Sequence, residues 1–119
     1  MKICITSTGD GPGAEVDPRF GRAEYFAIVD TDTESFDFIE NPALQASGGA
    51  GVQSAQFVVE RGVTAVLTGN VGPNAYKILN AGKVEVYTSV QGTVEKALAD
   101  FKNGDLSNQR TDAPTVKGK

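Results

Sequence analysis

The chain has no histidine and no tryptophan, and its only cysteine is Cys4. A lone cysteine cannot form an internal disulfide, and without histidine it cannot complete a Cys/His zinc site. Because Cys4 lies within an apolar stretch, a role as a small core residue is favoured over a role as ligand or nucleophile. Any bound metal must therefore be held by other groups.

Long apolar segments and an excess of positive charge are also missing. No hydrophobic run approaches the roughly 18 residues that a membrane span requires. Residues 2–7 already have the pattern of a strand, which leaves no room for a signal peptide. The formal net charge of −4 argues against broad binding to nucleic acid or to an acidic membrane. We therefore expect a cytoplasmic protein with neither of these partners.

The length of 119 residues, with 39% hydrophobic and 22% charged side chains, predicts one domain, which we place at residues 1–104. Residues 105–119 have little to bury and are predicted to form a mobile tail. Strands are predicted at 2–7, 25–30, 36–39, 63–68 and 84–87, and helices at 52–61, 73–81 and 93–101.

This order of elements combines an antiparallel hairpin with right-handed crossovers, and it predicts an α/β fold with a mixed five-stranded sheet between helices. If the first, fourth and fifth strands are parallel, their carboxyl ends share one edge with the N-termini of the helices. Open sheets usually bind ligands at such an edge. The loops that follow these strands are therefore the candidates for a binding site.

The long loop after the first strand contains Arg19 and Arg22, which flank Phe20 and a glycine. Guanidinium groups beside an apolar ring suit an anionic ligand. A brace in which Asp17 pairs with an arginine is an equally favoured interpretation, and both can hold.

The two other candidate loops, residues 47–51 and 69–75, each lead into a helix and are rich in glycine. Free backbone amides and the helix dipole favour an anion there. The first of them lacks the lysine of a Walker loop, so ATP binding has little support. A purely structural role remains open for both loops, and a role in turns and caps is at least as well supported for Asn70 and Asn74.

Catalytic groups are not apparent. The carboxylates of Asp10, Glu15 and Asp17 belong to one loop rather than to several elements, and no nucleophile–base pair is visible. We therefore expect a binding protein and not an enzyme.

Several short blocks of sequence together resemble a known family. The blocks are residues 1–3, 19–22, 40–42, 48–51, 69–75 and 84–87. In order and spacing they resemble the dinitrogenase iron-molybdenum cofactor biosynthesis family, the NifX-like domains, from residue 1 to about residue 102. The resemblance implies a three-layer α/β/α fold of the ribonuclease-H-like type. The chain is most similar to the small stand-alone members, which include a carrier of a molybdenum-copper-sulfide cluster.

The resemblance implies that the chain binds or delivers an anionic metal-sulfur cluster without turnover. The cluster is of the molybdenum-copper-sulfide type or an iron-molybdenum cofactor precursor, and a P-loop ATPase of cluster assembly is an implied partner. Some relatives have a histidine near the glycine-rich loop; its absence here excludes imidazole ligation. Because such a cluster already has its metals saturated by sulfide, it can be held noncovalently by amides, helix N-termini and arginines.

The residues predicted to bind the cluster are Arg19, Phe20, Arg22, Ser47, Gly48, Gly49, Ala50, Gly51, Gly69, Asn70, Gly72 and Asn74. None of them is predicted to be a direct metal ligand, and we expect a monomer or weak dimer. The alternatives are a module that binds a small anion or a nucleotide, and an adaptor for the cluster-assembly ATPase.

Overall fold

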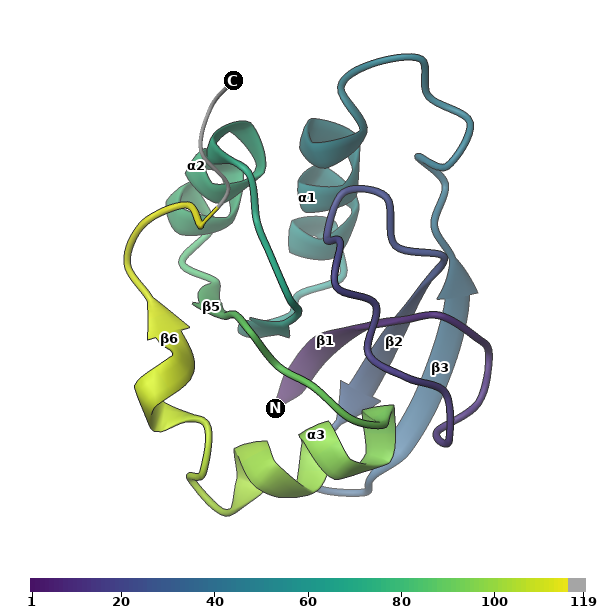
Figure 1. Cartoon of the computed structure of the whole chain (residues 1–119), viewed down its shortest axis with the longest axis vertical. Helices are drawn as coiled ribbons and strands as arrows, with labels where there is room; N and C mark the ends of the chain where they lie inside the picture. The colour runs from purple at the N-terminus through teal and green to yellow at the C-terminus, as the bar shows by residue number, and fades with distance from the viewer. Residues whose placement is uncertain (116–119) are drawn as a thin grey trace.

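The polypeptide forms one mixed sheet with helices on both of its faces (Figure 1). The structure is a computed structural model that describes residues 1–115. Its strands are β1 (Lys2–Ser7), β2 (Tyr25–Asp30), β3 (Ser35–Glu40), β4 (Ala65–Leu67), β5 (Glu85–Tyr87) and β6 (Arg110–Thr111). Its helices are α1 (Ala50–Glu60), α2 (Pro73–Ala81), α3 (Val94–Lys102) and the short 3₁₀ helix η1 (Ser107–Gln109).

The sheet has the strand order β3-β2-β1-β4-β5-β6. The central strands β1, β4 and β5 are parallel, whereas β2 and β3 form an antiparallel hairpin beside β1. The parallel arrangement that the sequence left conditional is therefore present. It brings the carboxyl ends of β1, β4 and β5 to one edge of the sheet.

Alternation along β1 shows how the sequence divides the core into two layers. Cys4 belongs to the cluster that packs under α1 and α2, while Ile3 and Ile5 belong to the cluster that packs under α3. Successive side chains of a strand point to opposite faces, so one apolar strand supplies both clusters. The predicted three-layer α/β/α architecture is confirmed. Cys4 itself is completely buried, and this burial raises the pKa of its thiol.

The prediction of five strands is wrong, because β6 pairs antiparallel with β5. The prediction that the tail has little to bury is also wrong for Leu106, which is only 5% exposed and packs in the cluster under α3. Gln109 then donates to the backbone carbonyls of Thr88 and Ser89, each at 3.0 Å. The mobility of the tail stays a prediction, and its residues 116–119 lie outside the described residues.

Within the described part of the chain, no helix is long and apolar enough to cross a membrane.

Candidate functional site

The edge formed by the carboxyl ends of β1, β4 and β5 is where the three predicted loops meet. The loop 8–24 leaves this edge after β1, and α1 and α2 begin close to each other above the sheet (Figure 1). Direct contacts join the first loop to each of the other two. The prediction that the three segments share one edge is therefore confirmed.

Asp17 determines the shape of the first loop. Its side chain is 0% exposed, and its carboxylate accepts hydrogen bonds from the backbone N–H groups of Arg19 (3.0 Å) and Glu24 (3.2 Å). The Arg19 guanidinium donates two more, at 3.2 and 3.3 Å. Its hydrogen bond with Asp17 raises the pKa of Arg19. The predicted brace between Asp17 and an arginine is present.

The first loop pairs with the third through backbone hydrogen bonds. Arg19 and Asn70 form a parallel bridge, in which the Asn70 N–H donates to the Pro18 carbonyl (2.8 Å) and the Phe20 N–H donates to the Asn70 carbonyl (3.2 Å). Gly69 is required at this crossing, because a Cβ added there would lie 2.5 Å from the Pro18 carbonyl oxygen. The glycine therefore permits two backbones to approach.

The first loop also contacts the start of α1. A Cβ added to Gly21 would lie 2.9 Å from the Cα of Gly51, so the two backbones are in close contact there. The Gly21 carbonyl accepts hydrogen bonds from the Ser54 hydroxyl (2.9 Å) and from the Asn41 side-chain amide (3.1 Å). Both donor residues are buried, so this contact is fixed from inside the protein.

A cavity of about 260 Å³ lies between the starts of α1 and α2. Its walls are formed by Gly21, Gly49, Ala50, Gly51, Val52, Gly72, Pro73, Asn74 and Ala75. Most of these side chains are very small or absent, so a ligand there meets backbone over much of the surface.

The cavity walls carry a set of free backbone donors. The first turn of a helix has no intrahelical acceptors for its N–H groups. In α1 these groups belong to Ala50, Gly51 and Val52, and in α2 they belong to Asn74 and Ala75. Within residues 1–115 none of these N–H groups has a hydrogen-bond acceptor. Both N-cap positions are glycine, and no side chain caps either helix.

The electrostatic character of the cavity is set by these amides. Each helix N-terminus carries about half a positive charge, and here two of them converge. Among residues 1–115, no ionisable side chain lines the walls, and no group of three or more His, Cys, Asp or Glu side chains is placed to hold a metal ion. The arrangement suits an anion.

The predicted site residues divide into two sets. Those that line the cavity are Gly49, Ala50, Gly51, Gly72 and Asn74. Those that lie outside its walls are Arg19, Phe20, Arg22, Ser47, Gly48, Gly69 and Asn70. Phe20 is 1% exposed and packs against Phe26 with ring centroids 5.8 Å apart, so its ring belongs to the core.

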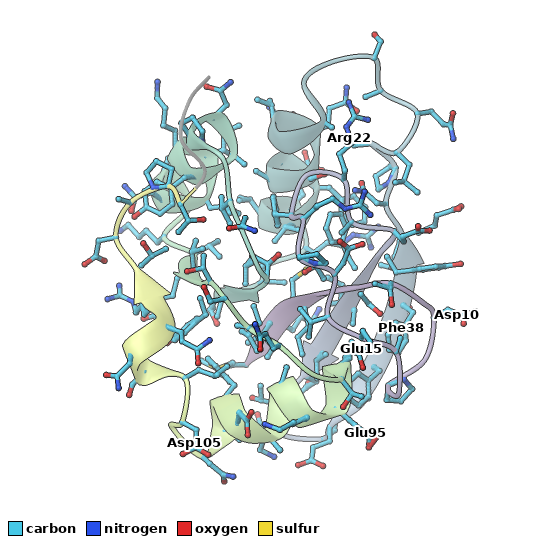
Figure 2. The ribbon with its side chains drawn as sticks, viewed as in Figure 1. Asp10, Glu15, Arg22, Phe38, Glu95 and Asp105 are labelled. Atoms are coloured by element: carbon cyan, nitrogen blue, oxygen red, sulfur yellow. The ribbon has the colours of Figure 1, made fainter. Side chains whose placement is uncertain are left out.

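Arg22 is close to the site without lining it. Its exposed guanidinium donates to the carbonyl of Ala46 at 3.1 Å, on the segment that leads into α1. Figure 2 shows Arg22 beside the upper end of α1. Arg22 therefore adds positive charge near the edge, whereas the charge of Arg19 is offset by the Asp17 carboxylate with which it pairs.

Sequence reasoning missed four of the lining residues, Gly21, Val52, Pro73 and Ala75. Val52 and Ala75 lie in the first turn of a helix, where the free N–H groups of the turn were a usable signal. Pro73 also lies in a first turn but has no N–H, so that signal does not find it. For Gly21 no such local signal exists, since its place in the wall depends on contact with Gly51.

Comparison with known proteins shows the family of the chain. Residues 1–104 match the family described as dinitrogenase iron-molybdenum cofactor, and the chain belongs to this family. The family relates to the handling of a metal-sulfur cofactor.

Relatives of similar length support the assignment. The apo form of the orange protein from Desulfovibrio gigas has a TM-score of 0.91 and 34% sequence identity, over 97% of this chain and 96% of that one. A Thermotoga protein of the DUF35 family has a TM-score of 0.83 and 35% identity, with 98% of each chain covered. The protein MJ0580 of Methanocaldococcus jannaschii is 31% identical over 109 residues, which is 89% of each chain.

Proposed function

We propose that this protein is a carrier that holds an anionic metal-sulfur cluster noncovalently in the cavity between the starts of α1 and α2. The observation that carries the proposal is the convergence of uncapped helix N-termini on a cavity whose described lining residues include no ionisable side chain. Family membership and similarity to the orange protein support a cluster of the molybdenum-copper-sulfide type or an iron-molybdenum cofactor precursor.

The chemistry of the cavity favours a preassembled polyanion over a bare metal ion. Metal cations are usually held by thiolate, imidazole or carboxylate ligands, and none of the described lining residues supplies one. The sulfide ligands at the surface of a thiometallate anion can instead accept hydrogen bonds from amides, in the way that phosphate does at helix N-termini. The contacts would come from the lining residues, with Arg22 adding charge from outside the walls and Arg19 bracing the loop through Asp17.

The size of the cavity supports a compact inorganic anion rather than a nucleotide. Organic ligands usually occupy sites of about 300–1,000 Å³. The cavity of about 260 Å³ lies below that range. A carrier role without turnover follows in this proposal, since a bound cluster would meet amides and no acid–base pair. Exchange with a P-loop ATPase of cluster assembly stays a prediction.

A titration tests the proposal directly. The purified protein is titrated with tetrathiomolybdate and copper, and formation of a coloured complex is followed by absorption. We expect saturable binding at a fixed ratio, and the same titration with a nucleotide should give no heat in a calorimeter. Failure of the protein to bind any thiometallate would refute the carrier proposal.

The variant Cys4→Ala separates noncovalent binding from ligation by the thiol. Cys4 is completely buried, and burial raises the pKa of its thiol, so its sulfur is expected to be protonated and out of contact with the cluster. The variant should give the same coloured complex with the same stoichiometry. Loss of the complex in a variant that still folds, as judged by circular dichroism, would return the thiolate to the site.

A further inference from the structure

The two edge strands of the sheet, β6 and β3, differ in length (Figure 1). At one edge β6 has two residues, and the Arg110 guanidinium lies near the carboxylates of Glu85 (3.9 Å) and Asp112 (3.6 Å). At the other edge β3 has six residues, all in continuous register with β2. Native proteins usually keep edge strands short or interrupt them with proline or a bulge. The long, uninterrupted β3 is therefore the edge that suits pairing with another strand.

The outer side of β3 offers backbone groups for such pairing. The strand is last in the sheet order, and within residues 1–115 its backbone has hydrogen-bond partners only on β2. In an antiparallel pair, alternate residues turn their N–H and C=O groups away from the partner strand. Half of the backbone groups of β3 therefore point outward, where an added strand can bond to them.

Each face of β3 presents apolar side chains next to an acidic one. On the face toward α3, Phe36 and Phe38 are partly buried and stack with ring centroids 5.8 Å apart. Alternation along the strand places the exposed Glu40 on the same face. On the other face Ile39 packs against the cluster under α1 and α2, and the exposed Asp37 accompanies it. An added strand would therefore extend both apolar layers while its side chains meet two carboxylates.

The hairpin of β2 and β3 is strongly acidic. Residues 24–40 contain six acidic side chains and no lysine or arginine, which gives a formal charge of −6 against −4 for the whole chain. Asp32 is paired with the N-terminal amine, and Glu34 with a lysine of α3. Asp37 and Glu40 have no ion-pair partner in the part of the chain that the structure describes. The exposed edge is left with uncompensated negative charge.

This charge selects the kind of strand that the edge can accept. Pairing β3 with a second copy of itself would bring two acidic hairpins side by side, which like charges disfavour. A basic strand would instead place lysine or arginine opposite Asp37 and Glu40, while its apolar side chains pack beside the two phenylalanines. We propose that β3 is the docking edge for an extended, basic and partly apolar segment of a partner protein, which pairs with it as an added strand. This inference does not depend on the carrier proposal.

A designed peptide is the probe for this edge. In an antiparallel alignment with β3, its central six residues place lysine opposite Asp37 and Glu40, valine opposite the three apolar residues and threonine opposite Ser35. Binding of the dye-labelled peptide is followed by fluorescence anisotropy, and amide hydrogen exchange is followed by NMR. We expect saturable binding with slower exchange at alternate amides of β3. Absence of binding, or binding without protection of β3, would overturn the proposal.

Methylation of the peptide amides separates strand pairing from attraction between charges. Two versions of the peptide carry methyl groups on alternate amides, one on the odd positions and one on the even positions. Their charge and composition are the same, but only one version keeps the N–H groups that face β3. We expect the other version to bind roughly tenfold more weakly. Equal affinities of the two versions would show that the peptide is held without backbone pairing, contrary to the proposal.

A charge-matched pair of protein variants tests the two carboxylates. The test variant is Asp37→Asn/Glu40→Gln, and the control is Asp105→Asn/Asp112→Asn, whose exposed side chains follow α3 and β6. We expect the test variant to bind the peptide about fivefold more weakly at low ionic strength, with the difference shrinking as salt is added. The control should stay within about twofold of wild type.

Two outcomes of these measurements would contradict the proposed partner. Equal peptide affinities in the two double variants would mean that the carboxylates of β3 do not select a basic strand. Sedimentation of the wild-type protein as a dimer, with slowed exchange at the β3 amides, would show that a second copy occupies the edge instead.

Discussion

The backbone N–H groups in the first turn of α3 have hydrogen-bond acceptors, whereas those at the starts of α1 and α2 have none among the described residues. In α3 the N–H of Val94 donates to the carbonyl of Ala14 at 2.8 Å and the N–H of Glu95 donates to that of Pro12 at 2.9 Å. The hydroxyl of Thr93 accepts from the next free N–H of the turn at 3.2 Å. The donors at the start of α3 are thus satisfied by the protein itself.

The starts of α1 and α2 have glycine in place of a capping side chain, and their first-turn donors face a cavity. Charge follows the same division. Figure 2 shows Glu15 and Glu95 near the start of α3 in the lower part of the view, and Arg22 beside α1 in the upper part. The described lining residues of the cavity include no acidic side chain. The difference indicates that the free donors at α1 and α2 are a specific feature of that region, because the same chain closes the third helix completely.

The largest expected effect comes from capping α2 as α3 is capped. Gly72 has an extended backbone (φ −76°, ψ 168°), and a Cβ added there meets no described atom within 4 Å. In Gly72→Asp the carboxylate should cap the helix, which stabilises the protein by about 0.5 kcal/mol. The same charge repels an anion a few ångströms away, so thiometallate binding should fall roughly a hundredfold. Calorimetric titration and urea unfolding measure the two quantities.

Gly72→Asn is the matched control, because its side chain caps the helix without adding charge. Its affinity should lie between those of wild type and Gly72→Asp. Unchanged binding in both variants would mean that this cavity is not the anion site.

The next effect concerns the loop 8–24, which contributes Gly21 to the cavity wall. In Asp17→Asn the buried side chain loses its charge and one of its acceptor atoms becomes a donor that faces other donors. We expect the free energy of unfolding to fall by about 2 kcal/mol, measured by urea denaturation. Arg19→Gln keeps the buried carboxylate and removes only its exposed partner, and should cost much less. A similar loss in both variants would place the stabilisation in the ion pair rather than in the buried carboxylate.

Removal of the side-chain cap of α3 should have a smaller effect. Thr93→Ala removes the hydroxyl that accepts from the Lys96 N–H, at a cost of about 1 kcal/mol in the free energy of unfolding. Because the other donors keep the carbonyls of Ala14 and Pro12, no anion site should appear at α3. The thiometallate titration should therefore be the same as in wild type. Altered stoichiometry would contradict the distinction between the two regions.

The smallest expected effect is a gain in the free energy of unfolding together with weaker thiometallate binding. A Cβ added to Gly51 would lie 3.4 Å from the Cβ of Ala75, which is ordinary contact. Gly51→Ala should raise the free energy of unfolding by about 0.5–1 kcal/mol, because alanine favours the helix. It also narrows the cavity, so thiometallate binding should weaken about threefold. Gly48→Ala, where no described atom lies within 4 Å of the added Cβ, is the control for binding. Stronger binding in Gly51→Ala would argue against a ligand between these helices.

Local patterns in the sequence predicted much of the fold. The apolar run at residues 2–7 predicted β1, Pro73 predicted the start of α2 and Thr93 predicted the cap of α3, all of which the structure contains. Each of these signals depends on residues within one or two turns of the chain. Periodicity and capping are local properties, and so the sequence alone is sufficient to specify them.

The same local reasoning predicted the candidate site only in part. It found the glycine-containing starts of α1 and α2, because free amides at a helix start follow from the helix itself. It placed Phe20 in the site, although the ring packs into the core against Phe26. It also missed β6, since two residues that pair with a distant strand carry no periodic signal.

The sequence by itself determined the order of elements from β1 to α3, the two-faced sheet and the free donors at the helix starts. Only the tertiary structure decided that Gly21 lies against Gly51 and Gly69 against Pro18, and that Ala75 completes the wall of a cavity. The physical reason is that these contacts join segments far apart in the sequence. Their formation depends on how the layers pack, which no local pattern of residues records.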